Sequence, residues 1–402
     1  MKLINYKTGL PMNYFQTDVQ IEVPEQFNLK DVRAFWVSNV VNIDLPKATN
    51  PEYKAKIQEM FETAKKFNIN TIFFQVRTTN DAFYKSKLNP TSRYLVEKEG
   101  DVPPFDVFKY VLDEAKKYGI EFHAWCNPYR VSMQKDLTKE QYLETCDDLN
   151  FAKRHPELVV VDKNGGLILN PARSEVKNFI IDSMLEILEN YDVAGIHFDD
   201  YFYPYAGLSD NDNDLADYEA SGKKVSLDQF RRDQITEVIK RLNDEIKAKH
   251  PGKRFGVSPF GIWKNKASDS LGSNTDPRCS ESYSNQYADS LLWIKEGYID
   301  YIVPQLYWDF AHPLAPFADL AVWWSEAVKG SKVDLYIGHG AYRLGSEGGY
   351  ENPLEVVNQL KFANQFETVK GNIFFTYKTF LDKDKSEQGM KLVCDLLNER
   401  KG

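Results

Sequence analysis

The chain of 402 residues lacks several features that would assign it to common functional classes. It has no run of about 20 apolar residues, so no membrane-spanning helix is predicted. Its four cysteines, Cys126, Cys146, Cys279 and Cys394, show no C-x-x-C spacing, which predicts reduced thiols and no zinc site. Lys and Arg number 50 against 59 Asp and Glu, a formal charge of -9. Phosphate binding needs a basic surface, so nucleic acid is excluded as the main partner.

Two catalytic motifs are also absent. No Gly-rich loop follows the first predicted strand, which argues against a dinucleotide-binding fold. No G-x-S-x-G elbow occurs, which argues against a serine hydrolase of that type. We therefore expect no organic cofactor.

The N-terminal segment MKLINYKTGLPMNYFQ lacks the continuous apolar stretch of a signal peptide. Two locations remain open on this observation: the cytoplasm, or an extracytoplasmic site reached after a signal has been trimmed. The sequence leaves the oligomeric state undetermined.

Aromatic residues, by contrast, are abundant at 14% of the chain. This exceeds what a core of this size needs and suits a site that stacks flat apolar faces such as those of sugar rings. The remaining composition, with 42% hydrophobic and 27% charged residues, is that of a globular protein with a sizeable core.

Eight short apolar segments, rich in β-branched and aromatic residues, predict β-strands. They are AFWVSNV (34–40), TIFFQVR (71–77), EFHAWCN (121–127), GIHFDD (195–200), FGVSPF (255–260), YIVPQLYW (301–308), LYIGHG (335–340) and NIFFTY (372–377).

Segments with helical periodicity separate these strands. The predicted helices cover 53–68, 105–119, 174–191, 227–250, 286–296, 316–329, 353–365 and 386–399. Eight strands alternating with eight helices predict a (β/α)8 barrel, an α/β fold known as the TIM barrel. We expect the barrel to occupy residues 31–402 and residues 1–30 to form an N-terminal extension that packs on it, closing its bottom.

Four strand-to-helix connections are long: 78–104, 128–173, 201–226 and 261–285. In a TIM barrel these loops lie at the C-terminal ends of the strands, where active sites form. The excess length of the chain is therefore predicted to build a binding cleft.

Polar residues are concentrated at the predicted strand ends. Alternation along each strand turns one set of side chains toward the barrel interior. The predicted inward or mouth residues are Gln75, Arg77, His123, Trp125, Asn127, His197, Asp199, Asp200, Ser258, Gln305, Tyr307 and His339. A structural barrel would fill these positions with Val, Ile and Leu, because unpaired buried polar groups cost a few kcal/mol each. Individually, His123 and His197 are also compatible with core histidines, and Arg77 with a simple ion pair.

The adjacent Asp199 and Asp200 end an apolar strand and indicate glycoside cleavage. One carboxylic acid protonates the leaving oxygen and the other stabilises or attacks the anomeric carbon. Asn127, Gln305 and the nearby tyrosines are predicted to bind sugar hydroxyls. The predicted stacking residues are Trp125, Trp263 and Trp308, and the predicted walls of a sugar subsite are Tyr201, Tyr203 and Tyr205. Asp309 is a second candidate acid.

A metal site is the competing use of these residues. His197, Asp199 and His123 would form its ligand set. The segment DNDND (210–214) resembles the start of a calcium loop but has Leu215 where the loop needs Gly, and Ser221 where it needs an acidic residue. We expect no metal.

Several motifs in the same order resemble the glycosyl-hydrolase-like 10 family of bacteria. They are FFQVRTTNDAFYKS (73–86), FHAWCNPYR (122–130), ILNPARSEV (168–176), GIHFDDYFYPY (195–205), FGVSPFGIWKN (255–265) and YIVPQLYW (301–308). The resemblance extends over about residues 31–380 and implies a (β/α)8 barrel with glycoside hydrolase activity. Family members include an envelope enzyme that cuts peptidoglycan glycan strands stripped of their peptides.

The resemblance also implies site residues. The family's paired aspartates fall on Asp199 and Asp200. Its cleft residues fall on Gln75, Arg77, Asp81, His123, Trp125, Asn127, Arg130, Asn170, Gln305, Tyr307 and Trp308. The expected function is hydrolysis of an O-glycosidic bond in an oligo- or polysaccharide, a bacterial or environmental glycan of N-acetylated, peptidoglycan-like type. Two alternatives remain: a non-catalytic glycan-binding barrel and a metal-dependent carbohydrate deacetylase or hydrolase.

Overall fold

The computed structural model describes residues 1–399; residues 400–402, the end of the expected barrel domain, lie outside the described residues. All eight predicted barrel strands are present and pair in parallel. Their bounds are β1 Val32–Val37, β2 Thr71–Arg77, β3 Glu121–Cys126, β6 Gly195–Phe198, β7 Arg254–Val257, β8 Tyr301–Ile302, β9 Gln305–Leu306, β10 Asp334–His339 and β11 Val369–Phe374. Pairing of β11 with both β10 and β1 closes the barrel, which confirms the predicted TIM fold.

The sixth barrel strand consists of two pieces, β8 and β9. Pro304 lies between them and has no backbone N–H for the ladder. Leu335 of β10 pairs with Ile302, and Gly338 pairs with Gln305, so both pieces remain in the barrel wall.

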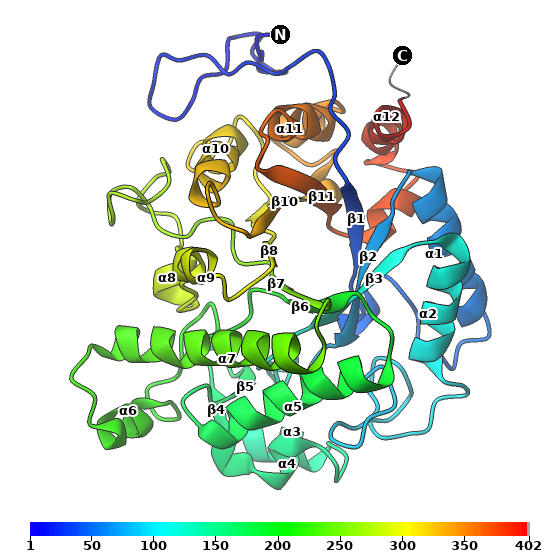
Figure 1. Ribbon diagram of the computed structural model, residues 1–402, viewed down its shortest axis with the longest axis vertical. Helices are drawn as coiled ribbons and strands as arrows, with labels where there is room; N and C mark the ends of the chain where they lie inside the picture. The colour runs from blue at the N-terminus through cyan, green and yellow to red at the C-terminus, as the bar shows by residue number, and fades with distance from the viewer. Residues whose placement is uncertain (400–402) are drawn as a thin grey trace.

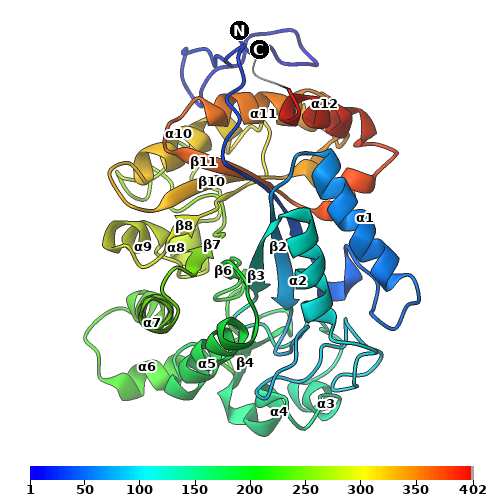
Figure 2. The same ribbon diagram turned by 45° about the vertical axis from the view of Figure 1, so that its right-hand side comes forward.

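The eight predicted helices also form, and Figures 1 and 2 show them around the outside of the barrel. They are α1 Tyr53–Lys66, α2 Val107–Tyr118, α5 Ser174–Asn190, α7 Leu227–Lys249, α9 Ser290–Glu296, α10 Phe317–Ala327, α11 Glu355–Asn364 and α12 Glu387–Leu397. Helix α2 ends at Gly119, whose φ of 65° is the left-handed conformation that glycine adopts at helix C-termini.

The loops, both long and short, contain short elements that the sequence did not predict. They are α3 Lys139–Glu144, α4 Phe151–Arg154, α6 Leu215–Ser221, α8 Ser282–Asn285, the antiparallel pair β4 Val159–Val161 and β5 Leu167–Leu169, and the 3-10 turns η1 Val40–Asn42, η2 Pro156–Leu158, η3 Ala341–Arg343, η4 Gly349–Glu351 and η5 Tyr377–Leu381. Pieces of three to seven residues carry too little periodicity to be recognised, because their packing rather than their own pattern stabilises them.

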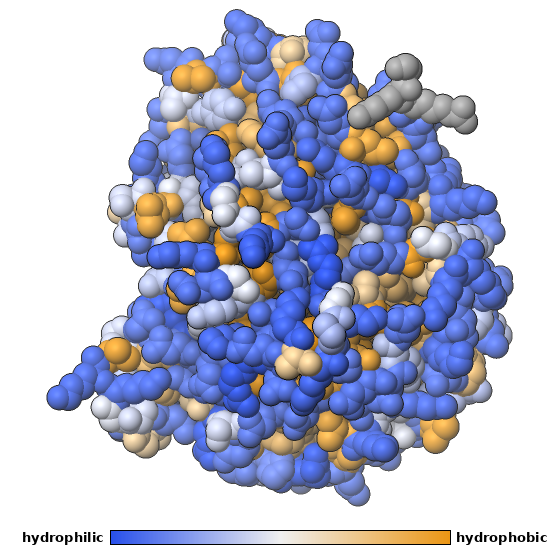
Figure 3. All heavy atoms as spheres, viewed as in Figure 1, coloured by the Kyte–Doolittle hydropathy of each residue, from blue (hydrophilic) through white to orange (hydrophobic). Residues whose placement is uncertain are grey.

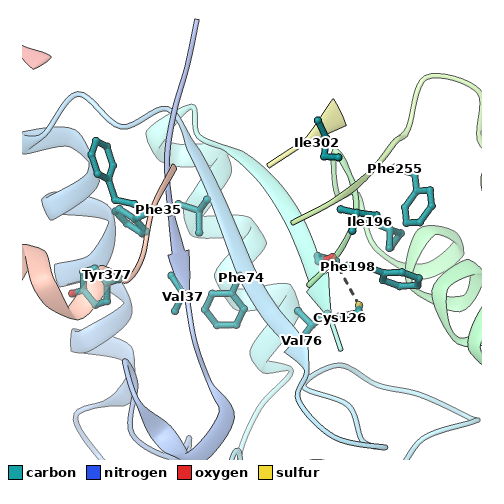
Figure 4. Close-up of a cluster of buried hydrophobic side chains, with 14 of the residues drawn as sticks. Phe35, Val37, Phe74, Val76, Cys126, Ile196, Phe198, Phe255, Ile302 and Tyr377 are labelled. Atoms are coloured by element: carbon teal, nitrogen blue, oxygen red, sulfur yellow. Dashed lines mark hydrogen bonds between the residues drawn. The ribbon is translucent and has the colours of Figure 1, made fainter. Parts of the chain in front are cut away.

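One face of each strand packs against the helices and forms the main hydrophobic core. Figure 4 shows this layer, and the labelled side chains from the strands alternate along the chain as predicted. The predicted helix-facing residues Cys126, Ile196 and Phe198 all belong to it and are fully buried.

The other face fills the barrel interior with rings and polar atoms. His123 stacks on Phe73 with ring centroids 4.7 Å apart. The Tyr301 hydroxyl lies 3.1 Å from His123 Nδ1 and 3.3 Å from His197 Nδ1. Trp36 Nε1 donates to His197 Nε2 at 3.2 Å. Burial lowers the pKa of both histidines, so they are neutral, fully hydrogen-bonded core residues below the barrel mouth.

Residues 1–23 form a ribbon of short antiparallel bridges, which we call the N-terminal ribbon. The sequence led us to expect that this segment closes the barrel bottom. It runs instead along the outer side of α10 and α11 (Figures 1 and 2). Asn364 Nδ2 donates to Asn28 O at 2.8 Å at one end, and Phe15 N donates to the Asp319 carboxylate at 3.1 Å at the other. Residues 1–28 together therefore span the full height of these two helices.

The surface seen in Figure 3 is largely hydrophilic, with apolar residues scattered between charged ones. Within residues 1–399, no helix has both the length and the apolarity that a bilayer crossing requires.

A glycine inside the barrel provides a test of its packing. A Cβ at Gly256 would lie 2.2 Å from the Tyr301 ring, which is held between the two histidines. We expect Gly256→Ala to lower the free energy of unfolding by about 2 kcal/mol or more, measured by urea denaturation. As a control, Gly119→Asn should change it little, because nothing lies within 4 Å and Asn tolerates a positive φ. Equal effects of both substitutions would contradict this description of the interior.

Candidate active site

The two adjacent aspartates lie at the C-terminal end of β6, in the barrel mouth. Asp199 is 4% exposed and accepts hydrogen bonds from Trp125 Nε1 at 3.1 Å and from Asn127 Nδ2 at 3.1 Å. The backbone N–H of Tyr201 donates to Asp199 Oδ1 at 3.2 Å. Trp125 is on β3 and Asn127 directly follows it, so pairing of β3 with β6 brings these donors to the carboxylate. The predicted inward orientation of Trp125, Asn127 and Asp199 agrees with these contacts.

Asp200, 6% exposed, has a different set of partners. The Tyr205 hydroxyl donates to Asp200 Oδ2, and the side chain of Gln305 donates to the same carboxylate. Gln305 Nε2 also donates to Ser258 O at 2.8 Å, which fixes the amide between β7 and β9. The Ser258 hydroxyl lies 3.0 Å from His197 Nε2, so the mouth is linked to the polar interior below.

Burial makes both carboxyls harder to ionise. It is the largest cause that raises the pKa of Asp199 and of Asp200, and the negative charge of Asp200 raises that of Asp199 further. The Arg130 guanidinium opposes this for both groups. Arg130 lies over the Tyr201 ring, 3.9 Å from its centroid, and its Nη1 donates to Thr78 O at 3.4 Å. The aspartates therefore titrate as a pair with one cation beside them.

The hydrogen-bond partners distinguish the two aspartates chemically. All partners of Asp199 named above are N–H groups, which only donate, so they stabilise its ionised form. The Tyr205 hydroxyl on Asp200 both donates and accepts, so it is compatible with either protonation state. The two carboxyls therefore have different partners, while burial raises the pKa of Asp199 to about 6 and raises that of Asp200 as well, so either group can carry a proton.

Two cavities lie near this pair at the barrel mouth, each lined by residues other than Asp199 and Asp200. One, of about 340 Å³, is lined by Arg130, Met133, Lys135, Tyr201 and Tyr205, among others. The other, of about 780 Å³, lies at the ends of β1 and β11 and is lined by Asp44, Tyr342, Phe375, Thr376 and Lys378, among others.

Tyr307 connects the second cavity to the carboxylates. Its ring stacks on Phe375 with centroids 5.7 Å apart, and its pKa is raised mainly by burial and further by the charge of Asp200. The sequence analysis missed Phe375 and Tyr342 as mouth residues. Alternation along the predicted strand 372–377 was the signal that identifies Phe375, whereas Tyr342 lies in a 3-10 turn with no such pattern.

Two predicted residues of the second strand have structural contacts. Gln75 Oε1 accepts from the backbone N–H groups of Asn39 and Val40 at 3.0 and 2.9 Å, which orders the loop after β1. Asp81 accepts from the N–H groups of Thr78 and Thr79 at 3.0 Å and so holds its own turn.

The predicted inward orientation of Arg77 is wrong. A register shift between Gln75 and Arg77 moves this side chain to the helix side, where its guanidinium lies 5.6 Å from the Phe179 ring centroid. Arg77 Nη1 donates to Asn127 O at 2.6 Å, so it supports the loop that carries Asn127 from outside the mouth.

Other predicted site residues also lie away from the carboxylates. His339 is buried on the helix side, where its nitrogens lie 3.1 Å from Gln359 Oε1 and 2.9 Å from Asn372 Oδ1. Trp263 stacks on Trp323 at 5.9 Å, outside the barrel wall. In β10, Tyr336 and Gly338 take the interior positions, so alternation turns His339 outward. Trp263 lies in the loop beyond β7, where strand alternation no longer applies.

Asn170 and Tyr203 are held by the long loops. Asn170 Nδ2 donates to Asp217 Oδ2 at 2.8 Å, and the Tyr203 hydroxyl donates to Asp214 Oδ2 at 2.8 Å. Tyr203 lines the smaller of the two cavities, but it is only 1% exposed, so Tyr201 and Tyr205, each 42% exposed, are the accessible rings.

Trp308 and Asp309 follow β9 at the rim. Trp308 meets Phe260 edge to face at 5.4 Å. Asp309 Oδ2 accepts from Gly349 N at 3.2 Å, so Asp309 contacts the loop after β10 rather than the aspartate pair.

The alternative metal ligand set is not assembled. The nitrogens of His123 and His197 lie against Glu121, Tyr301, Ser258 and Trp36, as neutral core histidines do. Within the described part of the chain, no three His, Cys, Asp or Glu side chains are grouped to hold a metal ion.

A closed TIM barrel with a buried carboxylate pair, amide donors and exposed aromatic rings at its mouth defines a barrel of the glycoside hydrolase class. The chain belongs to the glycosyl hydrolase-like 10 family, whose model matches residues 31–353. It is 37% identical over 382 residues to "Glycosyl hydrolase YngK" of Bacillus subtilis (strain 168), covering 92% of this chain and 73% of that one. It is 33% identical over 393 residues to "Glycosyl hydrolase DigH" of Escherichia coli (strain K12), covering 91% and 87%.

Solved structures with the same fold include two α-L-fucosidases. Isoenzyme 2 from Paenibacillus thiaminolyticus has a TM-score of 0.53 at 11% identity, and the match covers 90% of this chain but 49% of that one. A putative α-L-fucosidase from Bacteroides thetaiotaomicron has a TM-score of 0.53 at 13% identity, with 95% and 98% covered. At these identities the likeness concerns the fold alone.

Removing the Tyr205 hydroxyl tests the contact with Asp200. Its donated hydrogen bond lowers the pKa of Asp200, so Tyr205→Phe should raise that pKa and shift protonation of the carboxyl to higher pH. NMR titration of the Asp carboxyl carbons measures this shift. Tyr201→Phe is the matched control, because its ring is also half-exposed but its hydroxyl is not a partner of Asp200. An unchanged Asp200 titration in Tyr205→Phe would exclude the proposed contact.

Proposed function

We propose that this protein hydrolyses O-glycosidic bonds in a glycan and that Asp199 and Asp200 carry the reaction. The observation that supports this most directly is the buried pair at the end of β6, where two carboxyls have different partners and raised pKa values. Environments that distinguish two neighbouring acids are the means by which glycosidases assign acid and base roles. Membership of the glycosyl hydrolase-like 10 family supports the same reaction class.

In the proposed mechanism Asp200 is the general acid. Its proton passes to the glycosidic oxygen, the bond to the anomeric carbon breaks, and positive charge develops on the sugar ring. Tyr205 and Gln305 then donate to the newly formed Asp200 carboxylate. The Asp200 carboxylate afterwards takes a proton from a water molecule whose oxygen bonds to the anomeric carbon, which completes the hydrolysis and restores the acid.

In this scheme Asp199 is ionised while Asp200 carries the proton. Trp125, Asn127 and the Tyr201 N–H hold it ionised and fixed beside the developing positive charge. On an N-acetylated sugar the same carboxylate would orient the acetamido group, whose oxygen then attacks the anomeric carbon. Such substrate-assisted reactions are a known exception to the scheme with two acting carboxylates.

The proposed substrate is a β-linked bacterial or environmental glycan of N-acetylated, peptidoglycan-like type. The half-exposed rings of Tyr201, Tyr205 and Tyr342 around the carboxylates would stack on successive sugar rings. The two cavities near the pair would give room for sugar units on both sides of the cleaved bond.

Single substitutions of the two aspartates test the roles separately. We expect Asp200→Asn to lower kcat about 10²- to 10⁴-fold on natural glycans but far less on aryl glycosides whose leaving groups need no protonation. Asp199→Asn should lower both rates to a similar degree, because charge stabilisation is needed whatever the leaving group. Mass spectrometry of products from chitin oligomers and denuded peptidoglycan strands, with spectrophotometry of the aryl glycosides, measures these rates.

Near wild-type rates in both variants would remove the aspartates from the mechanism. The panel also separates the alternatives. A non-catalytic glycan-binding barrel would bind these oligosaccharides without new reducing ends, and a metal-dependent deacetylase would release acetate and lose activity to chelators.

A further inference from the structure

A third cavity, of about 290 Å³, lies at the barrel rim away from the aspartate pair. Residues 3–8 and Met12 of the N-terminal ribbon form one wall. The loops after β9 and β10 form the other, with Asp309, His312, Arg343, Gly349 and Glu355 among its lining residues. The cavity thus lies where the ribbon meets the C-terminal ends of two barrel strands.

Two buried polar atoms of this wall have no hydrogen-bond partner. Asp309 is 6% exposed, and its Oδ1 has none although its Oδ2 accepts from Gly349 N. The Nε–H of Arg343 is likewise buried and unpaired. Within the described residues neither side chain forms an ion pair, so the two opposite charges do not satisfy each other. Buried polar groups without a partner destabilise the fold, so these two call for a partner in the cavity.

The backbone of the β10 loop is shaped around this carboxylate. A Cβ at Gly349 would lie 2.6 Å from Asp309 Cγ, and neighbouring Gly348 has a φ of +96°. Both positions therefore require glycine if the loop is to approach Asp309 closely.

The remaining lining groups mix donors and acceptors. His312 Nδ1 accepts from Ala315 N at 3.0 Å, so its other nitrogen carries the proton. Lys7 is paired with Glu351 at 2.6 Å at the rim. A carboxylate with an unpaired oxygen and a guanidinium with an unpaired Nε–H line the same cavity. This pair of groups suits a hydroxyl group, which donates to the first and accepts from the second.

A row of partly exposed aromatic rings leads from Asp200 to this cavity. Tyr205, the partner of Asp200, meets Phe260 at 6.0 Å between ring centroids. Phe260 meets Trp308 at 5.4 Å, and Trp308 meets His312 at 6.3 Å. Sugar rings stack on such surfaces, so the row provides a track for a glycan chain between the two places.

We propose that the cavity at Asp309 and Arg343 is a distal saccharide subsite that binds a hydroxyl-rich sugar unit of a glycan whose other end lies at the aspartate pair. This rests on the proposed glycoside hydrolase function for the choice of ligand. Its consequence is that longer glycans bind more tightly than short ones, through contacts remote from the cleaved bond.

Binding without turnover provides the first test. In the Asp200→Asn background, we expect affinity for chitin oligomers or denuded glycan strands to rise with chain length, as measured by calorimetry. Adding Asp309→Asn or Arg343→Gln should weaken binding of the long oligomers about tenfold and leave the disaccharide unchanged. Arg278→Gln and Asp395→Asn, at exposed positions, are matched controls that should change neither.

Crystals of the Asp200→Asn protein soaked with the hexasaccharide provide the second test. A sugar ring between Asp309 and Arg343 supports the subsite, and water alone there overturns it, as does equal weakening of long and short ligands. The two proposals remain distinguishable. If the wild-type protein cleaves glycans while the cavity holds only water, the subsite fails alone; if a sugar binds there but no glycan is cleaved, the hydrolase function fails alone.

Discussion

Burial of two neighbouring carboxyl groups at the end of one barrel strand is the constraint on which the rest of the site depends. Ionised carboxylates in a low-dielectric interior require compensation, and each raises the cost of ionising the other. The surrounding residues compensate the two carboxylates unequally. N–H groups donate to Asp199, a hydroxyl and an amide donate to Asp200, and the charge of Arg130 favours the ionised form of both. A symmetric environment would leave the two groups interchangeable, whereas this one gives them separate chemical characters.

The barrel interior supports this arrangement with a polar layer instead of an aliphatic one. The side chains of this layer are hydrogen-bonded in series: Trp36 contacts His197, and Tyr301 contacts both His197 and His123. The series ends at Glu121, which lies 2.9 Å from His123 Nε2 near the barrel bottom. Because Ser258 joins this layer to Gln305, and Gln305 donates to Asp200, the position of the acid is set by packing several residues below it. Fully satisfied networks of this kind fix geometry more strictly than apolar contacts do.

The strands, helices and inward-facing residues of β3 and β6 were predictable because period-2 and period-3.6 patterns determine which face is buried. Arg77 was mispredicted because a register shift reverses a side chain without changing the hydrophobic pattern. His339 was mispredicted because Tyr336 and Gly338 take the interior positions of β10, so alternation turns His339 to the helix side. The partners of Asp199 followed from strand pairing, whereas the cavity at Asp309 depends on loops and the N-terminal ribbon. Contacts between segments more than 300 residues apart leave no periodic signal in either segment, as the pair of Asn28 and Asn364 illustrates.

The same long-range contacts determine when the fold can be completed during protein synthesis. β1 pairs with β11, so Val32 has no strand partner until Gly371 has been synthesised. The N-terminal segment likewise cannot pack until α10 and α11 have formed. The aspartate pair at the end of β6 therefore emerges from the ribosome at mid-chain, before Gln305 and Phe375, which lie beside it in the folded protein, have been synthesised. Until the last strand emerges, the open edges of β1 and the growing end of the sheet are unpaired and available to other chains. Barrel closure thus makes the nascent chain, rather than the finished enzyme, the state that depends most on protection from aggregation.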